Sequence, residues 1–132
     1  MKAKNLFLLF SIFLAAFSGN AQSDLTLSIH NNSESDVTVV VTFNQTINLS
    51  SPPNSPTSFT VASGATYVAH YKPDEYDVNF ASIKFTESGA APGHWTSNAM
   101  WLPVTFGSSS LTAELISYFG QGIYETLDFE IN

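Results

Sequence analysis

Aromatic and polar side chains in the second half of this sequence have the chemistry of a ligand-binding surface. The candidates lie in loop-like stretches or at strand ends, and they are His94, Trp95, Asn98, Trp101 and Tyr124. Tryptophan and tyrosine combine a flat apolar face with a polar edge, which suits stacking on sugar rings or docking on a protein surface. We therefore predict that these five residues bind a ligand. For each single aromatic ring, burial in a hydrophobic core is the competing interpretation.

The metal-binding candidates in the sequence are weaker. Asp74, Glu75 and Asp77 supply the oxygen ligands that calcium prefers, but the glycine and the distant glutamate of an EF-hand loop are absent. The three histidines of the chain lack the spacing of a zinc site. We expect no cofactor, with calcium at these three carboxylates as the alternative.

Signatures of common enzymes are missing. The sequence contains no G-x-S-x-G, no H-E-x-x-H and no phosphate-binding glycine motif. It has no cysteine, which excludes disulfides, thiolate ligands and cysteine nucleophiles. Nothing in the spacing singles out a pair of carboxylates for glycoside hydrolysis. We predict that the protein is not an enzyme.

The first 21 residues predict export. Lys2 and Lys4 precede an apolar run over residues 6–17, and small residues follow up to Ala21. The run has about 12 residues, whereas a helix that spans a bilayer needs about 20. We therefore predict a cleavable signal peptide over residues 1–21 and a secreted or periplasmic protein.

Removal of that peptide leaves an acidic chain. Residues 22–132 contain two lysines and no arginine against eleven carboxylates, a formal net charge of −9. Nucleic acids and anionic membranes both attract Lys and Arg. We expect a glycan or a protein surface outside the cell as partner and no nucleic acid, with a neutral membrane less favoured.

Apolar and polar residues alternate with a period of two along most of residues 22–132, which is the pattern of half-buried strands. Seven or eight such segments, separated by turns, predict a single all-β domain over residues 22–132. Its architecture is an antiparallel β-sandwich of immunoglobulin-like or jelly-roll-like type. The segments are residues 25–30, 37–44, 59–61, 66–71, 77–86, 100–106, 111–119 and 123–131.

Three of these segments carry more specific expectations. Along residues 77–86 the apolar parity changes between Phe80 and Ala81, which predicts a β-bulge. Along residues 100–106, Leu102 shares the parity expected to face the core, Trp101 faces outward, and Pro103 predicts an edge strand or a bulge. Residues 111–119 fit either a strand or a short helix, and we favour the strand.

These observations lead to one function hypothesis and two alternatives. The first is an exported, non-enzymatic recognition module that binds carbohydrate or a cell-surface partner through exposed aromatic residues. The second is a structural or assembly subunit, because weakly charged strands invite pairing between copies at their edges. The third is a membrane-active, lysin-like sandwich whose aromatic residues enter a neutral lipid surface.

Overall fold

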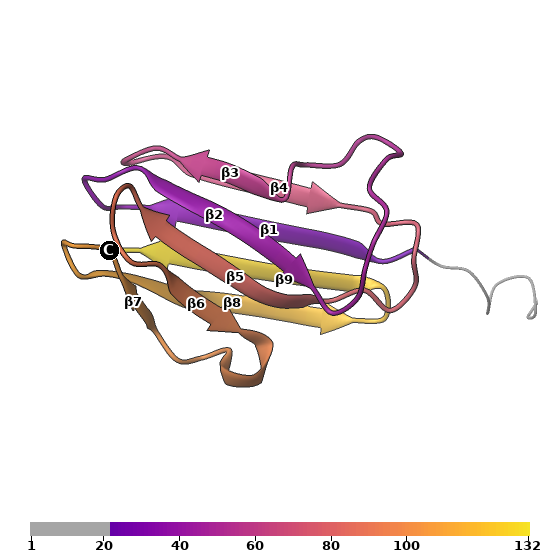
Figure 1. The fold of residues 1–132 in the computed structure, drawn as a ribbon. Helices are drawn as coiled ribbons and strands as arrows, with labels where there is room; N and C mark the ends of the chain where they lie inside the picture. The colour runs from indigo at the N-terminus through magenta and orange to yellow at the C-terminus, as the bar shows by residue number, and fades with distance from the viewer. Residues whose placement is uncertain (1–21) are drawn as a thin grey trace, which may run out of the picture.

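The described part of the chain is two β-sheets packed face to face (Figure 1). A computed structural model describes residues 22–132, so the predicted signal peptide lies outside the described residues. Within that range no helix has the length and apolar character of a membrane span. The predicted β-sandwich is confirmed, with more strands than expected. They are β1 (Asp24–Asn31), β2 (Val37–Phe43), β3 (Ser58–Val61), β4 (Thr66–Tyr71), β5 (Phe80–Glu87), β6 (Gly93–Thr96), β7 (Val104–Phe106), β8 (Leu111–Gln121) and β9 (Tyr124–Ile131), with the 3-10 turn η1 (Ser97–Ala99) after β6.

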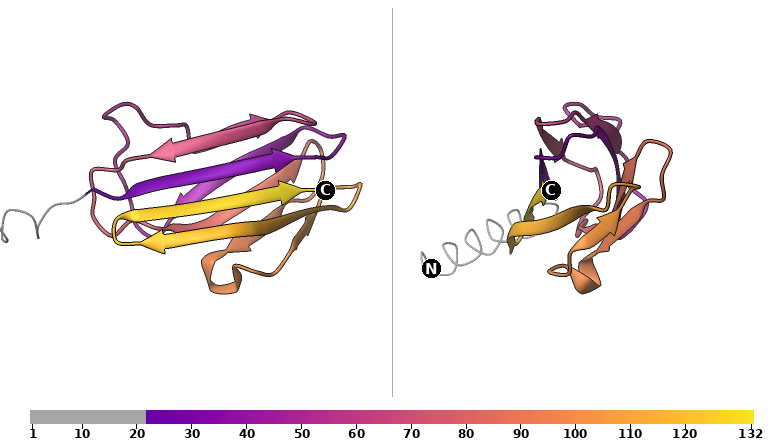
Figure 2. Two further views of the ribbon diagram at one scale, coloured as in Figure 1. Left: turned by 180° about the vertical axis from the view of Figure 1, so that it is seen from behind. Right: turned by 90° about the vertical axis from the view of Figure 1, so that its left-hand side faces the viewer.

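The order of the strands places the first and last strands of the described chain side by side. One sheet has the order β4-β1-β9-β8-β7 and the other the order β3-β2-β5-β6. β1 and β9 pair in parallel, with Leu27 beside Leu127, while the other strand pairs are antiparallel. Figure 2 shows these first and last strands side by side in the five-stranded sheet. The first strand therefore needs the last one to complete the sheet.

The alternation in the sequence becomes the core between the sheets. Leu25, Leu27 and Ile29 of β1 are fully buried, because successive side chains of a strand point to opposite faces. Full burial of one such side chain contributes about 1.5–3 kcal/mol. Aromatic rings fill the space near β8 and β9, where Phe85 packs on Phe129 with ring centroids 5.5 Å apart.

The predicted bulge is confirmed in β5. Thr42 of β2 pairs with Ser82, but its neighbour Phe43 pairs with Phe80, which leaves Ala81 without a partner. The extra residue changes the parity, so Phe80 and Ile83 both point into the core although their numbers differ by three.

Residues 111–119 are part of a strand, and the helix alternative is wrong. β8 runs from Leu111 to Gln121 and forms a hairpin with β9, from Ala113 opposite Ile131 to Gln121 opposite Tyr124. The register shifts between Leu115 and Ser117, so Ile116 is an extra residue. Pairing with β9 decides between two local patterns that the sequence leaves nearly equal.

Around Pro103 one prediction is confirmed and one is wrong. β7 is an edge strand, as Pro103 predicts, but it begins only at Val104. The preceding residues form a turn in which the Leu102 N–H donates to the Ala99 carbonyl oxygen (3.1 Å). Strand alternation does not apply in a turn, so Leu102 is 66% exposed rather than directed to the core. Trp101 is exposed as expected.

A buried amide joins the two sheets at the end opposite the β8–β9 turn. The Asn31 Nδ2 donates to the carbonyl oxygens of Ser35 (2.8 Å), Val61 (3.1 Å) and Ala62 (3.3 Å). Its Oδ1 accepts from the N–H (3.1 Å) and the hydroxyl (2.6 Å) of Ser33. Asn31 ends β1 in one sheet, and Val61 ends β3 in the other. The Asn31 side chain therefore connects the turn after β1 with the turn after β3.

We expect Asn31→Ala to lower the free energy of unfolding by about 2–4 kcal/mol, because it leaves several buried backbone groups without partners. The measurement is urea unfolding of residues 22–132. Asn32→Ala is the matched control, since the Asn32 amide donates to Glu130 at the exposed surface (2.9 Å). It should cost less than about 1 kcal/mol. Equal losses in the two variants would contradict the role of Asn31.

Candidate functional site

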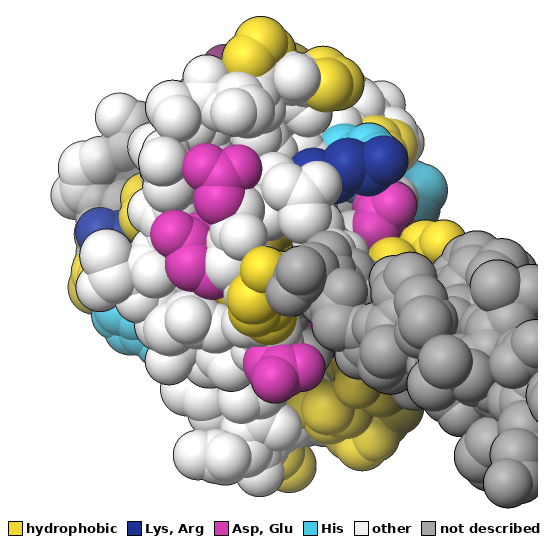
Figure 3. All heavy atoms as spheres, turned by 90° about the vertical axis from the view of Figure 1, so that its right-hand side faces the viewer, with side chains coloured by type: hydrophobic (Ala, Val, Ile, Leu, Met, Phe, Trp, Pro, Cys, Tyr) yellow, Lys and Arg dark blue, Asp and Glu magenta, His cyan; other side chains and the backbone are white. Residues whose placement is uncertain are grey.

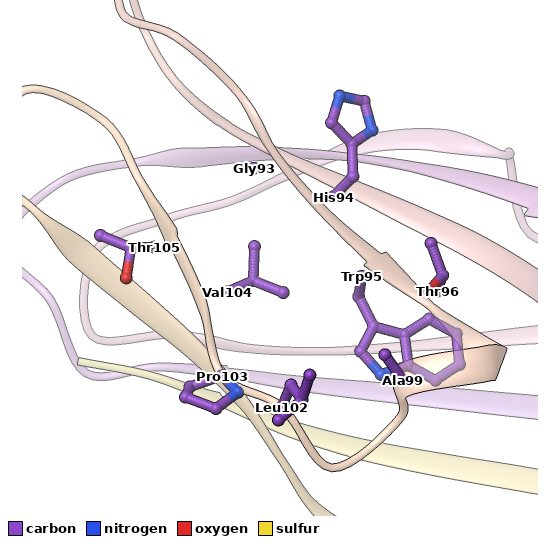
Figure 4. A pocket seen from close by; sticks show the side chains of 9 residues that line it. All are labelled: Gly93, His94, Trp95, Thr96, Ala99, Leu102, Pro103, Val104 and Thr105. Atoms are coloured by element: carbon purple, nitrogen blue, oxygen red, sulfur yellow. The ribbon is translucent and has the colours of Figure 1, made fainter.

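A groove lies where the chain crosses from one sheet to the other, between β6 and β7 (Figure 4). β6 is the edge of the four-stranded sheet, and β7 is the edge of the five-stranded sheet. The groove has a volume of about 340 Å³. Its lining residues are Gly93, His94, Trp95, Thr96, Ala99, Leu102, Pro103, Val104 and Thr105.

Gly93 allows the two edges to approach closely. A Cβ atom on this residue would lie 2.5 Å from Val104 Cγ1 and 3.0 Å from the Thr105 carbonyl oxygen, so no other residue fits without a shift of the backbone. The Gly107 N–H donates to the Ala91 carbonyl oxygen (3.1 Å) beside it. The close approach at Gly93 and this hydrogen bond therefore fix the backbone of β6 relative to that of β7.

Glu87 fixes the turn that follows β7. Its carboxylate accepts hydrogen bonds from the hydroxyls of Ser109 (2.8 Å) and Ser35 (3.0 Å) and from the Ser108 N–H (2.9 Å). These hydrogen bonds, led by the one from the Ser109 hydroxyl, lower the pKa of Glu87 because they stabilise its charged form. The charged carboxylate thus anchors the β7–β8 turn to the end of β5.

The structure places Trp95 in the core. Its ring is 1% exposed and packs edge-on against Phe129, with ring centroids 5.4 Å apart. The Nε1–H donates to the Met100 carbonyl oxygen (2.9 Å), which fixes the turn after β6. Trp95 therefore offers a ligand no open face, and its role in the groove is to hold the turn that carries Trp101.

His94, Asn98 and Trp101 lie on the segment from β6 to β7 and are exposed, and of the three His94 lines the groove. In Figure 4 the His94 and Thr96 side chains point to the opposite side of β6 from Trp95, and the His94 imidazole is directed away from Val104. Trp101 is 62% exposed, and the equally open Leu102 follows it. Sequence analysis missed Leu102 as a surface residue, because its parity matched that of the core.

Tyr124 is not part of this group. It is exposed at the start of β9, opposite Gln121. β7 pairs with the other end of β8, up to Ala113, and the eight residues from there to Gln121 span about 27 Å along a strand. The structure thus separates the five predicted residues into a segment beside the groove, a core residue and a tyrosine at the β8–β9 turn that does not line the groove.

The predicted calcium ligands do not form a cluster. Within residues 22–132, no three His, Asp or Glu side chains are placed to hold a metal ion. The Glu75 carboxylate accepts a hydrogen bond from the Asn48 N–H (2.8 Å). Two of the histidines contact carboxylates instead of one another, His30 with Asp128 (2.7 Å) and His70 with Asp24 (2.5 Å).

Glu125 is a buried carboxyl group that faces the core from β9, with 6% of its surface exposed. Burial raises its pKa to about 7, against the smaller opposite effect of a hydrogen bond from the Phe80 backbone N–H. The burial of Glu125 could have been predicted from the alternation along β9, because Glu125 has the parity of the buried Leu127 and Phe129. The core thus contains one acid that is neutral in mildly acidic solution.

Comparison of the sequence with protein-family models and with curated proteins finds no match. The candidate site therefore stands on its geometry alone, that is, on the groove and the side chains displayed beside it.

We expect Glu125 to make stability depend on pH. Its pKa is about 7 in the folded chain and about 4.5 when unfolded. Between these values the unfolded chain releases the proton while the folded chain keeps it, so stability falls as pH rises and levels off above about pH 7. The loss is about 3 kcal/mol.

Glu125→Gln removes this titration. Urea unfolding should show the variant and the parent chain equally stable near pH 4, and the variant more stable by up to about 3 kcal/mol at pH 8. Glu114→Gln, at an exposed carboxylate on β8, is the control and should leave the profile of the parent chain unchanged. A constant difference between Glu125→Gln and the parent chain across this pH range would contradict the assignment.

Proposed function

We propose that this protein is an exported, non-enzymatic recognition module that binds a neutral carbohydrate beside the groove between β6 and β7. The observation that carries the proposal is the open indole of Trp101 on a turn that the core holds in place. Trp101 is 62% exposed, and the turn around it is fixed by the hydrogen bond from Trp95 to the Met100 carbonyl oxygen.

The chemistry of the groove suits a sugar ring. Leu102, Pro103 and Val104 supply apolar surface, while His94 and Thr96 of β6 add polar residues to the lining. Sugars present C–H faces together with hydroxyl groups, so they match apolar surface flanked by a few polar groups. No carboxylate, lysine or arginine lines the groove, which supports an uncharged ligand.

Rigidity of the turn supports affinity. A binding surface that is already ordered loses little conformational freedom when its ligand arrives, and a tryptophan side chain has only two rotatable bonds to fix. Trp95 provides this order, because its ring is held by Phe129 and its N–H by Met100. The buried tryptophan thus acts as a positioning residue for the exposed one.

A neutral lipid surface is the second candidate. Trp101 and Leu102 are consecutive and both are more than half exposed, which is the arrangement of residues that enter the interface of a bilayer. The same residues would serve both functions, so the experiment includes neutral vesicles.

The test is titration of residues 22–132 with neutral glycans and, separately, with phosphatidylcholine vesicles. Tryptophan fluorescence and calorimetry follow binding. We expect saturable binding of one glycan class, with a blue shift of emission and protection from acrylamide, because Trp101 is the exposed tryptophan. Trp101→Ala should weaken binding by about 10- to 100-fold, which corresponds to about 1.4–2.8 kcal/mol, without lowering the melting temperature.

Tyr124→Ala is the matched control, since Tyr124 is also an exposed aromatic residue but lies at the β8–β9 turn. It should bind like the parent chain. Binding to vesicles alone would favour the lipid interface. Equal losses in the two variants, or no glycan binding at all, would contradict the proposed site.

A further inference from the structure

The second half of β8 is an open strand edge. β7 pairs with β8 only as far as Ala113, opposite Val104. From Glu114 to Gln121, β8 has β9 on one side, and no strand of residues 22–132 pairs with it on the other. Backbone N–H and C=O groups that point to such an edge can pair with another strand.

The other edge of this sheet, β4, is partly covered. The Ser55 N–H donates to the His70 carbonyl oxygen (3.0 Å), and the Ser55 hydroxyl accepts from the His70 N–H (2.9 Å). The Lys72 N–H donates to the Asn54 side chain (2.6 Å) next to them. The loop before β3 thus occupies the end of β4.

Both edges of the four-stranded sheet are short. β3 and β6 have four residues each, and β6 lies against β7 at Gly93. Strands of this length offer few groups for pairing. β8 is therefore the one long edge of the described chain that no other segment covers.

The exposed part of β8 lacks the charged side chains and the proline that usually protect an edge, and its bulge at Ile116 lies before the regular stretch from Ser117 to Gln121. Residues 115–121 contain no lysine, no proline and no charge, and they are rich in residues that favour strands. Large apolar side chains between 40% and 53% exposed lie on or beside this segment, and they are Ile116, Tyr118, Phe119 and Tyr124. Figure 3 shows hydrophobic side chains low on the end of the molecule to which β8 runs.

We propose that the edge of β8 from Ser117 to Gln121 pairs antiparallel with the same edge of a second copy of this chain. A twofold axis near Phe119 then joins the two five-stranded sheets into one continuous sheet of ten strands. Beyond the extra residue Ile116, the register of β8 with β9 is regular from Ser117 to Gln121, so this part can form an uninterrupted ladder.

Charge favours a second copy as the occupant. Each copy of residues 22–132 has a formal net charge of −9, so two copies can approach closely only where carboxylates are absent. Residues 115–124 contain none. An edge built for a partner of opposite charge would carry charges that attract it. In a twofold interface one patch supplies both halves, so a single uncharged edge is sufficient.

The size of the interface sets the expected affinity. A strand edge of five residues, together with the large exposed side chains of β8 and the neighbouring Tyr124 of β9, falls at the lower end of specific interfaces. We therefore expect a reversible dimer with a dissociation constant on the order of 10 µM. Salt should strengthen the dimer, because it screens the repulsion between the two acidic copies.

Sedimentation velocity of residues 22–132 between about 1 and 300 µM tests the proposal. The parent chain should change from monomer to dimer across this range, and amide exchange at residues 117–121 should slow as the concentration rises. Ser117→Lys places a charge on the open edge, as natural edge strands do, and should weaken the dimer at least tenfold. The new lysine lies opposite Asp128 on β9, so the monomer should keep its melting temperature.

Ser28→Lys is the matched control. Ser28 also lies beside Asp128 in the same sheet, but β1 has a neighbour on each side. This variant should dimerise like the parent chain. Trp101→Ala should also dimerise normally, which separates this proposal from the carbohydrate site. A monomer at 300 µM, or a dimer that Ser117→Lys leaves intact, would overturn the assignment to β8.

Discussion

The contact between Trp95 and Phe129 is the interaction on which the candidate site depends. Trp95 belongs to the edge of one sheet and Phe129 to a central strand of the other, so their edge-on packing joins the two layers beside the groove. The same indole holds the Met100 carbonyl oxygen through its N–H. Because the ring is held by its contact with Phe129 and by the hydrogen bond of its nitrogen, the turn that follows has a defined position and presents Trp101 to solvent.

The two proposed surfaces use different parts of one sheet. The groove depends on β7, which pairs with the first residues of β8, whereas the open edge begins where β7 ends. β7 is short because Pro103 lacks an N–H and a turn precedes it, so it cannot cover the rest of β8. The turn at Pro103 that precedes β7 thus also leaves the second half of β8 without a neighbouring strand.

Two buried polar side chains show different solutions to the same physical problem. The Asn31 amide is surrounded by hydrogen-bond partners from both sheets, so its burial stabilises the connection between them. Glu125 has the Phe80 N–H as partner, which does not offset the loss of water around a carboxylate, so its pKa rises. The Asn31 amide does not ionise, so its contribution to stability does not depend on pH. The Glu125 carboxyl group, at the opposite end of the sandwich, makes the stability of the fold depend on pH.

Local chemistry in the sequence determined the all-β class, the bulge at Ala81, the edge position of the strand after Pro103 and the outward direction of Trp101. Each follows from alternation along a strand or from the missing N–H of proline. Tertiary structure alone decided that Trp95 is buried, that Leu102 is exposed and that Tyr124 lies far from the groove. These outcomes depend on which strand lies across from each residue, and residues distant in the chain set that choice.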